Sequence, residues 1–160
     1  MSNRIEAEFF HISVDQAYKD GITQEEYERI TLPERATEGS AGYDFVSLRD
    51  VLIAPGETVL VPTGIRCRIE HGYNLDLHVR SSLGIKRGLR LANITGIIDE
   101  DYFNGENEGH IWAAMHNDGK VPAGIKAGER FVQGVFREYF IVCNDAATLK
   151  RIGGIGSTNK

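Results

Sequence analysis

The chain has 160 residues, of which 41% are hydrophobic and 26% are charged, and its formal net charge is −5. This length is typical of one domain (1–160) with one core, and the composition is far from that of disordered chains. The negative charge argues against a protein that coats nucleic acid, and no apolar run approaches the roughly 20 residues of a membrane-spanning helix. Because Glu6 and Glu8 stand where a signal peptide would be apolar, we expect a cytoplasmic protein.

Short segments that alternate apolar and polar residues, separated by glycines, predict an all-β chain. Period-two alternation at this spacing is typical of antiparallel strands in a sandwich or barrel. Turns are predicted at Pro55-Gly56, His71-Gly72 and Ala127-Gly128. The predicted strands cover residues 4–12, 57–70, 75–79, 109–115 and 130–142.

Helix is predicted only near residues 13–30, which together with a preceding strand make up an N-terminal part, 1–39. Ser13 to Gln16 and Thr23 to Glu26 match the capping box, and Gly21 would end the first of two short helices. The segment is otherwise polar, so we expect a peripheral insertion. At the other end, the glycine-rich sequence RIGGIGSTNK predicts a mobile tail over residues 150–160.

The two cysteines, Cys67 and Cys143, belong to no CxxC pair and lie in apolar, strand-like runs. Such residues are typical of reduced thiols in the core of a cytosolic protein. We therefore expect both to be buried and unpaired.

Arg80 follows a strand in which alternation directs Leu75 and Leu77 inward, and the sequence SSLG then turns the chain. A guanidinium, hydroxyl groups and glycine amides at one turn suit phosphate oxygens. Ser-Ser-x-Gly also occurs in plain loops, so these residues alone leave both interpretations open.

The sequence GIIDEDYFNGENE, residues 96–108, carries five carboxylates. A calcium loop that begins at Asp99 fails, because its fifth and sixth positions would be Phe103 and Asn104. A zinc site fails as well, because the sequence offers single pairs of His or Cys residues without the second pair that would complete four ligands. What remains is one carboxylate, Asp99, positioned by the apolar step before it and able to accept a proton from water. We expect its acidic neighbours to be solvated.

Five segments resemble, in order, the five motifs of the trimeric dUTPase family. They are SAGYDF (40–45), RSSLGIK (80–86), NITGIIDEDYFNGE (93–106), GERFVQ (128–133) and GGIGST (153–158). The resemblance implies an antiparallel jelly-roll subunit and a homotrimer with shared active sites. It also implies Mg²⁺-dependent hydrolysis of dUTP to dUMP and pyrophosphate, which lowers dUTP and supplies dUMP for dTTP synthesis.

The resemblance also assigns roles to single residues. Asp99 matches the general base that activates the attacking water, and Gln133 matches a glutamine that touches phosphate or that water. Tyr102 would lie beneath the deoxyribose and leave no room for a 2′-hydroxyl. Uracil would be recognised by backbone groups of Gly96 and Ile98, with the side chain of Asn93 assisting.

Phosphate and metal contacts complete the implied site. Arg80, Ser81 and Ser82 would bind phosphates, and Asp44 would hold water molecules around Mg²⁺. In the tail, Arg151, or Lys150 under an ungapped match, would reach the γ-phosphate. The implied tail contacts with the nucleotide are Ile155, which stands where relatives have a stacking phenylalanine, and its neighbours Gly156 and Ser157.

Three structural alternatives and two other functions stay open. Tyr102 and Gln133 are also plausible as ordinary strand residues, and Asp44 as a turn cap. The related dCTP deaminases share the fold, although the GIIDEDY pattern favours the hydrolase. A nucleotide-gated module, in which residues 13–30 contact a regulatory protein partner, is the other alternative.

Overall fold

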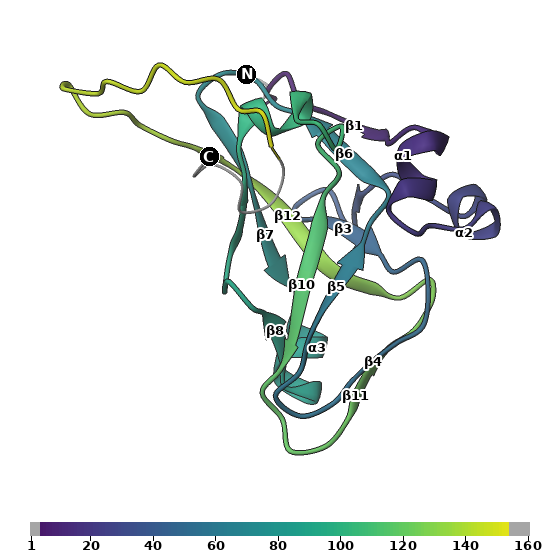
Figure 1. Cartoon of the computed structure of the whole chain (residues 1–160). Coiled ribbons are helices and arrows are strands. Elements are labelled where there is room, and N and C mark those ends of the chain that lie inside the picture. Colours follow the sequence, from purple (N-terminus) through teal and green to yellow (C-terminus); the bar gives the residue numbers. More distant parts are fainter. Residues whose placement is uncertain (1–3, 154–160) are drawn as a thin grey trace.

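The computed structural model describes residues 4–153, which form mainly antiparallel strands (Figure 1). The largest sheet has the strand order β2-β3-β12-β7-β9. Its members are β2 (Glu34–Arg35), β3 (Tyr43–Val46), β12 (Arg130–Glu138), β7 (Tyr73–Val79) and β9 (Gly96–Ile98). The predicted all-β class with little helix is confirmed.

A three-stranded sheet, ordered β5-β10-β8, and two strand pairs complete the β structure. Strand β1 pairs with β6, and β11 pairs with β4. The bounds are β5 (Thr58–Pro62), β10 (Trp112–Asn117), β8 (Leu89–Leu91), β1 (Glu8–His11), β6 (Ile65–Arg68), β11 (Ala123–Ile125) and β4 (Val51–Ile53). The predicted strand over 57–70 is thus two strands, because Gly64 takes a φ of 72° between them.

The core lies between these sheets and follows the period-two pattern of the strands. Leu75 and Leu77 of β7 are buried, as the alternation predicts, and so are Ala113 and Met115 of β10. Each fully buried leucine or isoleucine stabilises the fold by about 1.5–3 kcal/mol relative to an exposed one. The glycines of all three predicted turns have positive φ, which confirms those turns: Gly56, Gly72 and Gly128.

The two predicted N-terminal helices are present as α1 (Val14–Lys19) and α2 (Gln24–Glu28). Thr23 and Glu26 form a complete capping box, and Gly21 takes a φ of 73° after α1. The expectation that this segment is peripheral is wrong. Its apolar residues belong to the core, because each turns its side chain toward the sheets: Ile12, Ala17, Ile22 and Ile30.

Helix outside residues 13–30 is a second difference from the prediction. The segment after Arg80 forms α3 (Ser81–Arg87), which ends at Gly88 with a φ of 66°. A 3₁₀ helix, η1 (Glu100–Asn104), follows β9. Serines and a central glycine have low helix propensity, so the sequence of α3 resembles a turn, and tertiary packing of Leu83 overrides it.

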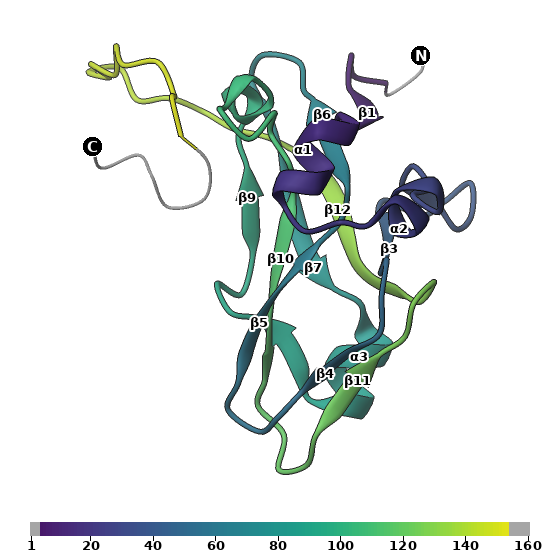
Figure 2. The same ribbon diagram turned by 45° about the vertical axis from the view of Figure 1, so that its right-hand side comes forward.

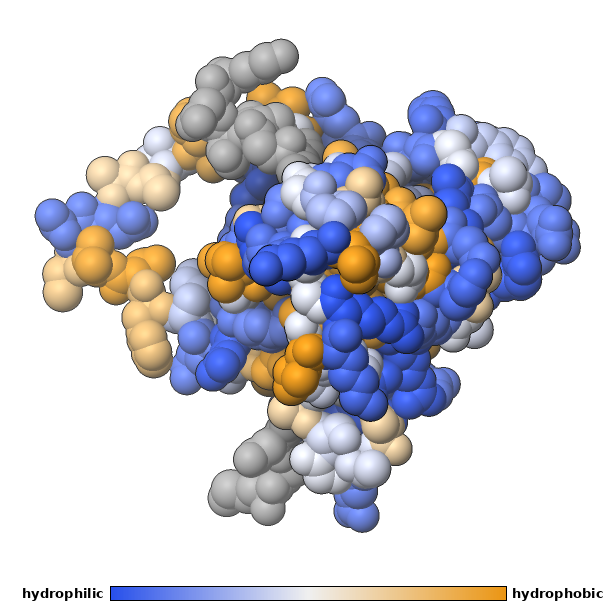
Figure 3. Space-filling view, turned by 90° about the horizontal axis from the view of Figure 1, so that it is seen from below, coloured by the Kyte–Doolittle hydropathy of each residue, from blue (hydrophilic) through white to orange (hydrophobic). Residues whose placement is uncertain are grey.

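Strand β12 ends at Glu138, and residues 139–150 form an extended arm that leaves the body (Figures 1 and 3). Hydrophobic side chains along this arm are exposed, including Phe140, Ile141 and Val142. The predicted strand over 130–142 is therefore too long. The expectation of two buried cysteines holds for Cys67, whose thiol pKa burial raises to about 12, and is wrong for Cys143, which is exposed on the arm.

No helix within residues 4–153 is both long and apolar enough to cross a membrane.

Candidate functional site

A cavity of about 230 Å³ lies beside β9 and η1. Six of the residues predicted for the site line it, namely Asn93, Gly96, Ile98, Asp99, Tyr102 and Arg151. Its remaining lining comes mostly from apolar side chains of neighbouring strands, Leu60, Leu77, Leu91, Ile97, Trp112 and Ala114. The structure thus brings the whole predicted base and sugar region, and one tail residue, to one cavity.

Strand β9 supplies one wall of this cavity. It pairs with β7 on one side only, among the strands that the structure describes, so the backbone groups of its outer edge are available to a ligand. Gly96 lies tightly against β7, because a Cβ at this position would be 3.3 Å from the Cβ of Leu77. Gly96 is therefore close-packed against β7.

Asp99 lies between β9 and η1, with its carboxylate at the cavity. Burial raises the pKa of this carboxyl above its ordinary value. The positive charge of Arg151 opposes that rise, and the negative charges of Asp101 and Glu100 add to it. The Arg151 guanidinium forms an ion pair with Asp99 and donates a hydrogen bond of 2.7 Å to Asp101.

Tyr102 is buried in η1, and its ring lines the cavity. Its hydroxyl donates a hydrogen bond of 2.8 Å to the carbonyl oxygen of His110 and accepts one of 2.9 Å from the side-chain amide of Asn107. Both polar capacities of the hydroxyl are therefore used inside the protein. The ring is held at its hydroxyl end and lines the cavity.

The expectation of solvated acidic neighbours is wrong for Glu100 and Glu108, which are partly buried and hydrogen-bonded, whereas Asp101 is half exposed and also ion-paired. Glu100 accepts hydrogen bonds of 2.9 Å from the ring of His71 and from the backbone N–H of Gly72. Asp101 accepts from Arg151, and Glu108 accepts two hydrogen bonds from Ser13. These carboxylates hold segments together that are far apart in the sequence.

A second group of predicted residues gathers elsewhere in the sheet. Arg80, which precedes α3, and Arg130 of β12 lie 3.3 and 3.5 Å from the buried carboxylate of Asp44. Gln133 is registered opposite Asp44, and its side-chain oxygen would be 2.3 Å from a Cβ at Gly42. The Gln133 side chain thus packs against the backbone of Gly42, so the first and fourth motifs pack directly together.

Ser81 and Ser82 extend this second group, because both are exposed at the beginning of α3. We call these five residues the phosphate-site cluster, after the role the motifs imply: Asp44, Arg80, Ser81, Ser82 and Gln133. We call the residues of the first set the nucleoside-site cluster: Asn93, Gly96, Ile98, Asp99 and Tyr102.

The strand register separates Asp99 from Arg80 within one chain. Leu75 pairs with Ile98, so Asp99 lies level with Asn74, whereas Arg80 is six positions further along β7. At about 3.3 Å per residue this is about 20 Å. Figure 2 shows the same separation, with the coil after β9 at one end of the sheet and α3 at the other.

Trp112 is a cavity residue that the sequence reasoning missed. It lies on the face of β10 opposite the buried Ala113 and Met115, and it lines the cavity with Ala114. The available signal was the alternation itself, which directs the chain's one tryptophan out of the core.

The tail is described only as far as residue 153. Arg151 reaches the cavity, and Lys150 is exposed. The predicted contacts of Ile155, Gly156 and Ser157 lie outside the described residues.

Comparison with known proteins decides the family. A family model described as dUTPase matches residues 28–158. The chain belongs to the dUTPase family. A deoxyuridine 5′-triphosphate nucleotidohydrolase of Lactococcus lactis subsp. lactis is 42% identical over 140 residues, which are 86% of this chain and 93% of that relative. The family and the enzyme class that the motifs predicted, dUTP diphosphatase, are therefore confirmed.

Solved dUTPase structures have the same fold. The crystal structure of the dUTPase from Streptococcus mutans superposes with a TM-score of 0.69 at 41% identity, covering 84% of this chain and 97% of that one. A dUTPase of Staphylococcus bacteriophage 80alpha, solved with dUpNHpp, superposes with a TM-score of 0.67 at 19% identity, covering 98% of this chain and 94% of that one.

Proposed function

We propose that this member of the dUTPase family hydrolyses dUTP to dUMP and pyrophosphate by attack of water on the α-phosphorus. The observation that carries the proposal is the single cavity in which an exposed strand edge, an aromatic ring and a carboxylate meet. A base, a sugar and a reacting phosphate need these three kinds of group in that order.

The edge of β9 supports recognition of uracil. Backbone N–H and C=O groups at Gly96 and Ile98 have directions set by the sheet, and the side chain of Asn93 lines the same cavity. Fixed donors and acceptors reject a base with the opposite pattern, because the wrong base leaves buried polar groups unpaired. Cytosine, whose amino group replaces a carbonyl, would be rejected in this way.

Tyr102 supports selection of deoxyribose. Its ring is buried and held by its hydroxyl, so it cannot move aside for one additional oxygen. A 2′-hydroxyl would meet the ring face, where it finds no hydrogen-bond acceptor to replace water.

Asp99 would act as general base and take a proton from the attacking water. The aspartate that does so must be ionised, and Arg151 stabilises the ionised form. When phosphates bind, Arg151 would exchange its carboxylate partners for the γ-phosphate. Its position at the cavity favours Arg151 over the exposed Lys150 for that contact.

The phosphate-site cluster of one subunit would complete the active site of another subunit. Residues about 20 Å apart along β7 cannot both act at one α-phosphate, so a single chain holds two halves of different sites. A homotrimer with shared sites brings such halves together. Arg80, Ser81 and Ser82 would then contact phosphate oxygens, and Gln133 the phosphate or the attacking water.

The phosphate-site cluster also suits a Mg²⁺ ion that arrives bound to the substrate. Within residues 4–153 no three His, Cys, Asp or Glu side chains gather to hold a metal. Mg²⁺ needs only one or two carboxylates when substrate phosphates supply the other ligands, and Asp44 lies beside the phosphate-binding Arg80. When bound, Mg²⁺ would neutralise charge on the phosphates, and Asp44 would orient its water molecules.

Two other functions make different predictions. A dCTP deaminase would release ammonia from dCTP, and a nucleotide-gated binding module would bind dUTP and a protein partner without needing Asp99. The test is pyrophosphate release from dUTP, dTTP, dCTP and UTP, with and without Mg²⁺. We expect release from dUTP alone and only with Mg²⁺; release of ammonia from dCTP would contradict the proposal.

A further inference from the structure

Helix α1 contacts the loop of residues 105–110 at both of its ends. At its beginning, the backbone N–H and the hydroxyl of Ser13 donate hydrogen bonds of 2.8 and 2.6 Å to the carboxylate of Glu108. At its end, the carboxylate of Asp20 lies 2.6 Å from the ring Nδ1 of His110. The N-terminal insertion is thus attached, across about ninety positions of sequence, to the loop that follows η1.

His110 connects Asp20 to the cavity. The ring is fully buried, and its Nε2 accepts a hydrogen bond of 2.9 Å from the backbone N–H of Gly64. Nε2 therefore carries no proton, so Nδ1 carries it and donates to Asp20. Both ring nitrogens are engaged, and the carbonyl oxygen of the same residue accepts the hydroxyl of Tyr102.

The loop leaves η1 no freedom to move separately. Glu108 takes a φ of 57°, which few residues other than glycine adopt, and its carboxylate accepts both donors of Ser13. At Gly109 a Cβ would lie 2.6 Å from the Cα of Phe103, so the two backbones touch. A shift of the loop must therefore displace η1.

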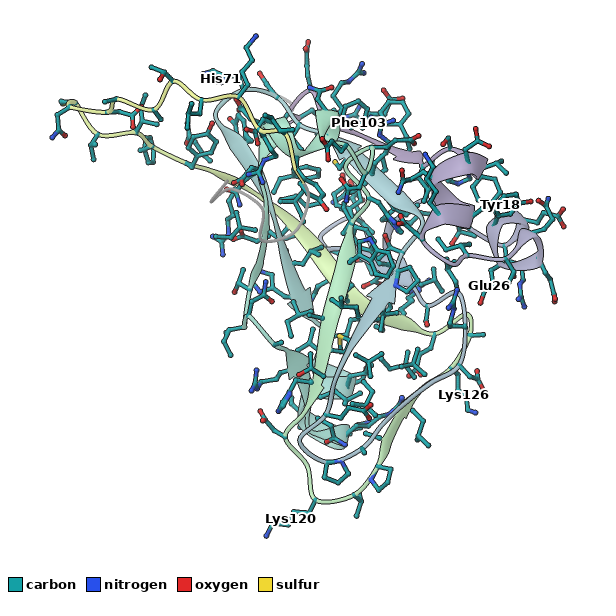
Figure 4. The ribbon with its side chains drawn as sticks, in the orientation of Figure 1. Tyr18, Glu26, His71, Phe103, Lys120 and Lys126 are labelled. Carbon is teal, nitrogen blue, oxygen red and sulfur yellow. The ribbon has the colours of Figure 1, made fainter. Side chains whose placement is uncertain are left out.

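The other side of η1 is fixed as well. The guanidinium of Arg66, on β6, lies 3.7 Å from the centre of the Phe103 ring and donates a hydrogen bond of 2.8 Å to the Phe103 carbonyl oxygen. Figure 4 shows Phe103 at the same end of the molecule as Tyr18 of α1. Helix α1 thus contacts the loop after η1, and β6 contacts η1 itself.

We infer that α1 is a positioning element for the sugar site, in which Ser13 and Asp20 fix the ring of Tyr102 through the 105–110 loop. The inference rests on the proposed function, because it assumes that Tyr102 excludes the 2′-hydroxyl. Ser13, Asp20 and His110 touch no substrate in this scheme. Their effect is on the choice between dUTP and UTP.

The decisive variant is Asp20→Ala, which leaves the buried Nδ1–H of His110 without an acceptor. Partners that orient metal ligands change activity by about 10–100-fold when removed, and we take the lower end of that range for a partner that orients Tyr102. We expect the preference for dUTP over UTP, measured as the ratio of the two kcat/KM values, to fall by about tenfold. Asp20→Asn keeps an acceptor oxygen and should retain the ratio within about twofold.

Asp15→Ala is the matched control, because this carboxylate lies on the same helix and makes no side-chain hydrogen bond within residues 4–153. It should leave the ratio unchanged. If Asp20→Ala fails to fold, Ser13→Ala decides in its place. It removes the shorter Ser13–Glu108 bond at an exposed position, and it should lower the ratio about threefold.

Two results would overturn the inference. One is a folded Asp20→Ala or Ser13→Ala variant with the wild-type ratio, even if its melting temperature is lower. The other is an equal loss of kcat/KM for dUTP and UTP. A wild-type protein that releases no pyrophosphate from dUTP contradicts the proposed function instead, so the two failures are distinguishable.

Discussion

At the scale of single residues, the site depends on one carboxylate with an unusual environment. Asp99 lies beside two other carboxylates and one guanidinium, at the edge of a mostly apolar cavity. Burial and the like charges favour the protonated form, whereas Arg151 favours the ionised form. In the proposed mechanism, the balance between them sets the pH below which Asp99 loses its capacity to act as a base.

Asp99→Asn should lower kcat for dUTP by about 10²–10⁴-fold, because an amide cannot accept a proton from water. Nucleotide binding should survive, since the strand edge and Tyr102 are unchanged. Binding of the α,β-imido analogue of dUTP can be followed through the fluorescence of Trp112 in the cavity. Asp101→Asn is the control, because it removes a partner of Arg151 and keeps the base. Wild-type turnover in Asp99→Asn would exclude the base role.

Arg151→Ala should move the acid limb of the pH profile of kcat/KM to higher pH. The base acts only when ionised, so activity falls as the pH falls through the pKa of Asp99, which is already raised. Loss of the neighbouring positive charge raises that pKa further. Lys150→Ala, at the exposed neighbouring position, should leave the limb in place. A limb that moves to lower pH in Arg151→Ala would contradict this account.

At the scale of elements, short segments far apart in the sequence form the site's frame. Helix η1 carries Tyr102, and the loop that follows it is bonded to α1 and packs against η1 at Gly109. Gly109 takes a φ of 71° and has no room for a side chain. Its requirement for glycine is therefore both conformational and steric.

Gly109→Ala should lower the free energy of unfolding by about 3 kcal/mol, because backbone strain and overlap with η1 add. Gly128→Ala is the matched control: its φ is 79°, and nothing lies within 4 Å of the added Cβ. It should cost only about 1 kcal/mol of strain. Urea unfolding of both variants measures the difference. Equal losses would show that the contact between the loop and η1 is loose.

At the scale of the whole molecule, one chain holds two of the proposed site residues, Asp99 and Arg80, far apart. Asp99, which follows β9, and Arg80, which precedes α3, lie about 20 Å apart along β7, and Figure 2 shows these two segments at opposite ends of the sheet. The arm of residues 139–150 also leaves the body with exposed hydrophobic side chains (Figure 3). A lone subunit would therefore have separated half-sites and an uncovered apolar arm.

Mixing two inactive variants should restore activity if subunits share sites. Arg80→Ala impairs the phosphate-site cluster, and Asp99→Asn impairs the nucleoside-site cluster. Some sites in a mixed assembly therefore receive an intact half from each chain. The two proteins should be unfolded together, refolded and assayed for pyrophosphate release. A chain that carries both substitutions, refolded with either single variant, is the control and should stay inactive. No gain in the mixed sample would place each complete site within one chain.

The sequence by itself determined the family, the β class, the turns and the members of the phosphate-site and nucleoside-site clusters. These depend on local order, because strand alternation, turn glycines and motif residues are all readable within a few positions. The same locality explains the errors. Tertiary packing made a helix of Ser81–Arg87 against its propensity, and the end of β12 at Glu138 left Cys143 exposed.

Only the tertiary structure decided where the N-terminal insertion is attached and how far Asp99 lies from Arg80. Ser13 and Glu108, and likewise Asp20 and His110, are bonded across 95 and 90 positions, and no local pattern specifies such pairs. Folding brings them together because Ile12, Ala17 and Ile22 bury their side chains in the core. The distance between Asp99 and Arg80 likewise follows from strand register, which exists only once β7 and β9 have paired.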